Sequence, residues 1–355
     1  MTVRPFLLHV LMNITGSTVF SITGILFAAQ LAFAQSDFDM SQRQLNESLY
    51  NPAATGTDFS TTVYSHMRAQ WVNMPGAPTT EVVGVNHYIY GLNTAVGLSI
   101  TGDQIGFTNT YSARLAFAYY IPLFSSSALS FGLSAGLLSR NQNASGALVD
   151  DLTDGELHFG NISEAVPDFD FGFEFMSKPK SPIFKLLKIG CVAKHLSGSH
   201  DASTYFKSYS TNVWSYISLR FTAGQRIALE PSLSHVYRDK FNRFEGGAIA
   251  YFLKTESYDK YWLGAMWRLH GQFSILAGLS LTPNLKIGYS FDHAPSELSR
   301  ISELGTHELF MSWRIFRSQD KRDSGDGYCP AYRTKGRNSG KNKFLNDVSH
   351  RFVIY

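Results

Sequence analysis

A five-residue stretch in the first half of the chain has the spacing of a catalytic serine. Gly132-Leu133-Ser134-Ala135-Gly136 matches G-x-S-x-G, the nucleophile elbow of serine hydrolases, which requires a strand, a sharp turn and a helix. Here the stretch lies within an alternating run, ALSFGLSAGLLSR, in which Gly132, Ser134 and Gly136 are the small residues of the polar face. We therefore expect no catalysis from Ser134, and Ser134→Ala is the variant that tests a hydrolase hypothesis.

A second stretch, DDLTDGELHFGN at 150–161, is similar to the calcium loop of an EF-hand. Leu152 stands where a ligand belongs and Asn161 replaces the bidentate glutamate, so we interpret the stretch as an acidic surface loop. The histidines are scattered without a ligand spacing such as H-E-x-x-H, and the sequence has no glycine-rich phosphate loop or cysteine knuckle. We predict a protein that is not an enzyme and has no metal, cofactor or catalytic residue.

The composition favours strands over a helical enzyme. Hydrophobic residues make up 44% and charged residues 17%, with 27 Phe, 18 Tyr and 29 Gly, which suits strands, aromatic girdles and tight turns. The net charge of +3 is too small to indicate nucleic-acid binding. The two cysteines, Cys191 and Cys329, lie in unrelated settings and make no disulfide framework.

The first residues predict export. Arg4 precedes an apolar run that ends in Ala32-Phe33-Ala34, an A-x-A signal, so we expect residues 1–34 to be a signal peptide cleaved before Gln35. An uncleaved anchor is the alternative, although polar residues interrupt the run. After Gln35 no stretch approaches the roughly 18 apolar residues of a membrane helix. The mature chain is therefore a soluble exported protein or a barrel in an outer membrane.

An apolar–polar alternation recurs about fourteen times after Asp58. The segment lengths suit strands that cross a bilayer at a tilt. Pro231 lies inside one of them and indicates an irregularity there. The predicted strands are 58–71, 79–90, 93–102, 108–120, 128–140, 168–177, 184–195, 209–221, 226–238, 242–254, 259–269, 272–281, 284–292 and 307–316.

The polar faces of these strands carry charges that a dry core would not accept. A soluble sandwich, with the apolar rows packed inside, is the alternative to a barrel. The long connections 72–78, 141–167, 196–208 and 293–306 alternate with short turns, as in outer-membrane barrels, and favour the barrel. In that fold a wet lumen is lined by Arg68, Arg114, Arg140, Glu174, Lys188, Arg220, Arg268, Glu308 and Arg314.

We therefore predict an all-β protein, a transmembrane antiparallel up-and-down outer-membrane barrel of about 14 strands spanning 58–316. Residues 35–57 are expected to be a periplasmic lead-in and 317–355 a polar, basic periplasmic tail. An even strand count places both termini in the periplasm. The tail is interpreted as a solvated segment, with an electrostatic partner as the alternative.

Several stretches fall in an order that is specific to one family, although each alone is weak. SLYNPAATG, RAQWVNMPGAPTT, PDFDFGFEF, LKIGYSFDH and GTHELFMSWRI together resemble the PorP/SprF family of type IX secretion system membrane proteins from Bacteroidetes, over residues 42–317. The resemblance implies a non-enzymatic outer-membrane barrel, surrounded by lipid. It also implies secretion or gliding subunits and client proteins with a C-terminal sorting domain, such as gliding adhesins, as partners.

The two stretches most typical of the family supply candidate interface residues: Asn51, Pro52 and Gly56 in N-P-A-x-x-G, and Gln70, Trp71 and Pro78 in Q-W-x-x-x-P-G-A-P. A structural interpretation stays open for both. The first stretch would form the turn into the first strand, and Trp71 of the second would be an anchor at the membrane interface. The alternative function is a passive pore or transporter, because a barrel of about fourteen strands encloses a lumen unless it is plugged.

Overall fold

The computed structural model describes residues 37–124, 126–143, 161–179, 181–197, 211–238, 241–255, 258–269, 272–293 and 304–315. The chain forms two units, Met1–Phe38 and Asp39–Tyr355, and every described helix and strand belongs to the second. The predicted cleavage residues Ala32, Ala34 and Gln35, residues 150–160 of the calcium-like stretch and the tail 317–355 lie outside the described residues.

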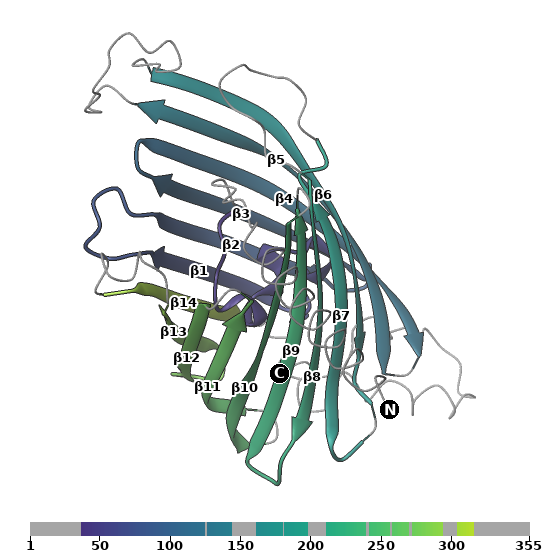
Figure 1. Ribbon diagram of the computed structural model, residues 1–355. Coiled ribbons are helices and arrows are strands. Elements are labelled where there is room, and N and C mark those ends of the chain that lie inside the picture. The colour runs from purple at the N-terminus through teal and green to yellow at the C-terminus, as the bar shows by residue number, and fades with distance from the viewer. Residues whose placement is uncertain are drawn as a thin grey trace, which may run out of the picture. The chain divides into compact units, whose positions relative to one another are not determined.

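Fourteen strands, each antiparallel to its neighbours, form a closed barrel in sequence order, and β14 pairs with β1 (Figure 1). The predicted fold class is confirmed, and each predicted strand has one counterpart. The strands are β1 (Thr61–Ala69), β2 (Thr79–Ile89), β3 (Thr94–Ile105), β4 (Thr108–Phe124), β5 (Ser127–Asn143), β6 (Asn161–Ser177), β7 (Phe184–Lys194), β8 (Asn212–Thr222), β9 (Ile227–Arg238), β10 (Phe241–Thr255), β11 (Tyr258–Arg268), β12 (Gln272–Ser280), β13 (Leu285–His293) and β14 (Thr306–Ile315).

The two faces of the wall have the reverse of the burial found in a soluble protein. Leu115 is 66% exposed and Leu137 63% exposed on the outside, whereas Glu174 and Glu308 are each 1% exposed on the inside. Rows of outward Leu, Phe and Trp are what a lipid-facing barrel presents. All described strands belong to one sheet that closes on itself, so no second sheet among the described residues covers these rows, and the sandwich alternative is wrong.

The connections sort by length between the two ends of the barrel. One end, the long-loop end, carries the connections 70–78, 144–160, 195–211 and 294–305 together with three short ones. The other, the short-turn end, carries 90–93, 125–126, 178–183, 223–226, 256–257 and 281–284. The sorting predicted from the sequence is therefore present.

Two details of the wall bear on the predictions. The expected long connection 141–167 is shorter, because β5 runs to Asn143 and β6 begins at Asn161, where backbone pairing extends the hairpin beyond the strong alternation. The irregularity predicted at Pro231 is confirmed. The β8–β9 ladder is interrupted between the pairs Ser218↔Ser232 and Phe221↔Leu229, as expected of a residue without an N–H.

Three short 3-10 helices precede the barrel strands: η1 (Arg43–Leu45), η2 (Glu47–Leu49) and η3 (Pro52–Ala54). Among the residues that the structure describes, no helix combines the length and the apolar character needed to cross a membrane.

Candidate functional site

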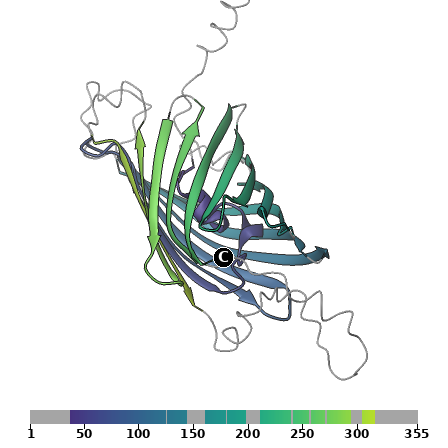
Figure 2. The same ribbon diagram turned by 90° about the horizontal axis from the view of Figure 1, so that it is seen from below.

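Residues 39–57, called here the inner segment, lie inside the barrel (Figure 2). Near its start, Ser41 N–H donates to Glu308 Oε2 at 2.7 Å, close to the long-loop end of β14. Near its end, Tyr120 donates to the carbonyl of Thr55 at 2.6 Å, close to the short-turn end of β4. The segment therefore runs along the lumen from the long-loop half to the short-turn half, whereas a lead-in would lie outside the barrel.

Asn51 and Pro52 begin the third helix of this segment. Asn51 Oδ1 accepts the N–H of Ala53 at 3.0 Å as an N-cap, and Pro52 occupies the first helical position, where no N–H is needed. The Asn51 amide also donates to the carbonyl of Phe173 at 3.1 Å and to the Tyr216 hydroxyl at 3.2 Å. Gly56 follows with φ of 77°, a conformation that other residues adopt rarely. In this structure the N-P-A-x-x-G residues fold and anchor the inner segment.

The barrel wall lies very close to η3 at strand β5. A Cβ on Gly132 would overlap the backbone of Pro52 and Ala53, so only glycine fits at that position. Two residues earlier, Ser130 Oγ donates to the Ala53 carbonyl at 2.8 Å. The first glycine of the G-x-S-x-G stretch thus makes room for the inner segment.

A cluster of arginines and carboxylates, the upper cluster, fixes the start of the inner segment. Arg68 lies 2.7 Å from Asp292 and 3.1 Å from Glu308, while Asp39 lies 2.8 Å from Arg243 and 3.0 Å from Arg43. Arg43 also pairs with Glu245. The upper cluster consists of Asp39, Arg43, Arg68, Arg243, Glu245, Arg268, Asp292 and Glu308.

The upper cluster has as many arginines as carboxylates, so its charges offset one another. Burial opposes ionisation of Asp39, but Arg243, Arg43 and Arg268 outweigh burial and hold the pKa of Asp39 below its ordinary value. The start of the inner segment is therefore tied to β10 and β11 by charge.

A second cluster, the lower cluster, lies around the middle of the inner segment in the short-turn half. It consists of Glu47, Lys188, Arg220 and Glu230. Lys188 Nζ lies 2.6 Å from Glu47 Oε2, and Arg220 Nε lies 2.7 Å from Glu230 Oε2. Burial, reinforced by the nearby Glu174 and opposed by Lys188, raises the pKa of Glu47 to about 8. A polar cavity of about 100 Å³ lies here, and its lining includes Glu47, Asp58, Lys188, Arg220, Lys286 and Arg314.

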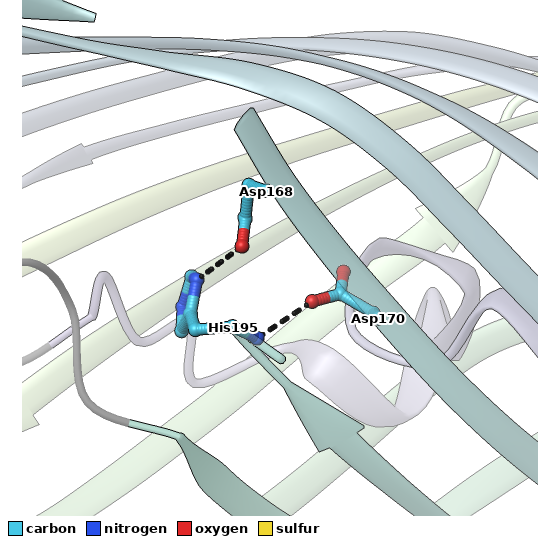
Figure 3. A group of neighbouring side chains, drawn as sticks. All are labelled: Asp168, Asp170 and His195. Atoms are coloured by element: carbon cyan, nitrogen blue, oxygen red, sulfur yellow. Dashed lines mark hydrogen bonds and ion pairs between the residues drawn. The ribbon is translucent and has the colours of Figure 1, made fainter. Parts of the chain in front are cut away.

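A third group joins β6 to the end of β7 (Figure 3). His195 Nδ1 lies 2.9 Å from Asp168 Oδ1, and the His195 N–H donates to Asp170 Oδ1 at 3.0 Å. The other oxygens are also engaged, since Arg114 donates to Asp168 Oδ2 at 3.0 Å and Ser134 to Asp170 Oδ2 at 2.7 Å. Side chains of these types can hold a metal ion, with ligand atoms within 4.8 Å of one another. Here they tie two strands together.

The same group bears on the hydrolase hypothesis. Ser134 lies in a straight, paired part of β5, opposite Ala116 of β4 and Asp170 of β6, and not in a strand–turn–helix elbow. Its hydroxyl donates to a carboxylate that also binds the backbone of His195. The arrangement is that of a buried structural hydrogen bond.

All nine residues predicted to line the lumen lie on the inner face of the wall. Arg68, Arg268 and Glu308 meet in the upper cluster, and Lys188 and Arg220 belong to the lower cluster with Glu174 and Arg314 nearby. Arg114 joins the Asp168 group instead. Arg140 stands apart, opposite Glu164 in the β5–β6 register near the long-loop end.

The second family stretch lies elsewhere, in the loop 70–78 between β1 and β2. The Gln70 N–H donates to the Pro78 carbonyl at 2.9 Å and closes the loop. Trp71 has φ of 47°, and its N–H donates to Thr306 Oγ1 at 3.3 Å. Gln70, Trp71 and Pro78 are therefore at the long-loop end, away from Asn51.

Sequence reasoning missed the lining residues that come from the inner segment, Asp39, Arg43 and Glu47. It also passed over Asp168, Asp292 and Glu245 on the wall. Alternation along β6 and β13 puts Asp168 and Asp292 on the polar, inward face of each strand. On β10 the inward row of Glu245 also holds the apolar Ile249 and Tyr251, so alternation gives no clear signal there. For the inner segment, the capping pattern of Asn51 and Pro52 was the available signal.

Comparison with known proteins gives a family match. Residues 32–313 match the family model for the type IX secretion system membrane protein PorP/SprF. No curated protein matches the chain.

Solved outer-membrane proteins are similar at low identity. Omp33 of Acinetobacter baumannii is 12% identical with a TM-score of 0.40, covering 72% of this chain and 98% of that one. The toluene transporter TbuX of Ralstonia pickettii is 11% identical with a TM-score of 0.45, covering 76% and 93%. A Pseudomonas aeruginosa FadL homologue is 12% identical with a TM-score of 0.41, covering 75% and 93%. We infer no cargo for this chain from these likenesses.

Proposed function

Since the chain belongs to the type IX secretion system membrane protein PorP/SprF family, we propose that it supports secretion or surface attachment of proteins with a C-terminal sorting domain, such as gliding adhesins, without itself being an enzyme. The family and the closed barrel make it an outer-membrane protein.

The observation that carries the proposal is the filled interior of the barrel. A passive pore needs a continuous water path along its lumen. In this protein the inner segment runs along the lumen and is tied to two strands of the wall, to β10 by Arg43–Glu245 and to β7 by Glu47–Lys188. Such a barrel suits a structural role in a larger assembly better than solute passage, so a pore is not proposed.

The placement of the ends is part of the proposal. With the long-loop end outside the cell, β14 ends at Ile315 on the periplasmic side, where the tail 317–355 is then expected as well. The N-terminal side differs, because Asp39 lies in the long-loop half beside Arg243 and Arg268. The periplasmic N-terminus stays part of the proposal on the even strand count.

Deletion of the gene tests the proposal. We expect particular sorting-domain proteins to disappear from the cell surface, measured by surface labelling and mass spectrometry, while uptake of small solutes stays unchanged. The full-length gene supplied in trans should restore display. Unchanged display together with reduced solute uptake would support a pore and contradict the proposal.

A further inference from the structure

The β5–β6 hairpin continues beyond the end of β7 at the long-loop end (Figure 1). On β5 the outward side chains change from Leu133 and Leu137 to Ser139 and Asn141, and on β6 outward Phe169 gives way to smaller side chains. Large apolar side chains are favoured where the wall faces hydrocarbon, and small or polar side chains where it faces water. Residues 139–143 and 161–167, called here the raised hairpin, therefore project beyond the apolar band on the long-loop side.

One edge of the raised hairpin has no strand partner among the described residues. β6 pairs with β5 along its whole length but with β7 only over 171–177. Just beyond that ladder, the Leu196 N–H donates to the Phe169 carbonyl at 2.8 Å. From residue 168 back to 161, β5 is the sole described strand that pairs with β6.

The Asp168 group explains why the β6–β7 ladder stops at a fixed point. His195 has φ of 57°, which turns the chain away from the strand direction directly after β7. Its ring and its N–H are held by Asp168 and Asp170 of β6. The side chains thus replace backbone pairing at the end of β7.

The backbone geometry indicates which groups face the open edge. In a strand, the N–H and C=O of one residue point to the same side and those of the next residue to the other. Because the Phe169 carbonyl points toward β7, the same side receives the backbone groups of Ser163, Ala165 and Pro167. Pro167 has no N–H to offer there, as is typical of proline on an edge strand. Between Ser163 and Pro167 the edge then presents two N–H donors and three carbonyl acceptors.

We propose that this edge of β6 binds an extended segment of a sorting-domain client by β-strand addition, with the client strand pairing to Ser163, Ala165 and Pro167. The inference rests on the proposed function, which supplies a client on the outer side of the membrane. Three features favour a strand over other occupants. The groups are backbone groups in register, the side chains at Ser163 and Ala165 are small and exposed, and the edge lies outside the apolar band.

A pair of substitutions at one position tests the backbone contact. Ala165→Pro removes an edge N–H, whereas Ala165→Val keeps it and enlarges the side chain about as much. Loss of one backbone hydrogen bond should lower the surface-attached client about tenfold in Ala165→Pro and leave it unchanged in Ala165→Val. Barrel level and heat-modifiable mobility on gels verify that both variants fold. Equal display in folded Ala165→Pro and Ala165→Val would overturn the inference.

Photo-crosslinkers at Ser163 and at Ala165 then identify the occupant. The probe is the sorting-domain protein that the gene-deletion strain fails to display. We expect both positions to crosslink to one extended client segment, at residues two apart, because neighbours on a shared sheet face repeat every second residue. Crosslinks to residues 198–210 of this chain instead would overturn the inference, and so would no client crosslink. Client display that survives gene deletion would defeat the proposed function itself, so the two failures are distinguishable.

Discussion

The wall of the barrel and the inner segment are stabilised in different ways. The wall is a closed ladder in which every strand pairs with two neighbours through backbone groups. The inner segment has three short 3-10 helices and is held by side chains, chiefly through Arg43, Glu47 and Asn51. Single side-chain changes should therefore loosen the inner segment while the wall persists, and the following predictions compare the two.

The largest effect is expected from Arg43→Ala. Removing this guanidinium leaves Asp39 and Glu245 buried with less counter-charge, which should weaken docking of the inner segment by about 3–5 kcal/mol. Limited proteolysis of the purified barrel should then cleave within 39–57, while the wall keeps its heat-modifiable mobility.

Gln44→Ala is the matched control for Arg43→Ala. Gln44 is the next residue, and its side-chain amide has no hydrogen-bond partner among the described residues. We expect wild-type protection of residues 39–57 in this variant. Equal cleavage of Arg43→Ala and Gln44→Ala would show that the upper cluster does not hold the segment.

The next effect depends on pH through Glu47, which faces Lys188, Glu174 and Glu230. Its pKa of about 8 in the docked segment is above the ordinary value of 4.5, so the docked state keeps a proton that the released state loses. Docking should therefore weaken as pH rises between those values, by at most about 1.4 kcal/mol per pH unit. Protection of 39–57 from protease at pH 5.5 and pH 8 measures this, and Glu47→Gln should abolish the difference.

A smaller effect is expected where the wall meets the third helix. Gly132→Ala places a methyl group against the backbone of Pro52 and Ala53, and should cost about 1–3 kcal/mol of docking free energy. Gly246→Ala is the control, because a Cβ there meets its nearest atom at 3.7 Å. Hydrogen exchange of residues 51–56 distinguishes the two; similar exchange in both variants would refute the close approach.

The smallest effect is expected from Ser134→Ala. The variant loses one hydrogen bond to Asp170, worth about 0.5–1.5 kcal/mol, and Asp170 keeps its bond to the His195 N–H. Client display should stay at the wild-type level. A loss of display in a normally folded Ser134→Ala barrel would revive a chemical role for this serine.

The difference between the wall and the inner segment also explains which parts of the structure could be predicted from the sequence. Most strands of the wall alternate apolar and polar residues. The position of a residue such as Leu137 or Glu174 within its strand therefore predicts whether its side chain points outward or inward. The position of the inner segment depends on contacts between distant residues, such as Glu47 with Lys188 and Gly132 with Pro52. No local pattern encodes those contacts. Likewise, the start of β6 at Asn161 follows from pairing with β5, since residues 161–166 alternate weakly.

Ion conductance in planar bilayers tests most directly whether the inner segment closes the barrel. Purified wild-type protein should show no large, steady conductance, while a variant that lacks residues 39–57 should conduct steadily through the emptied lumen. A large, steady conductance from the wild-type barrel, equal to that of the deletion variant, would contradict the account.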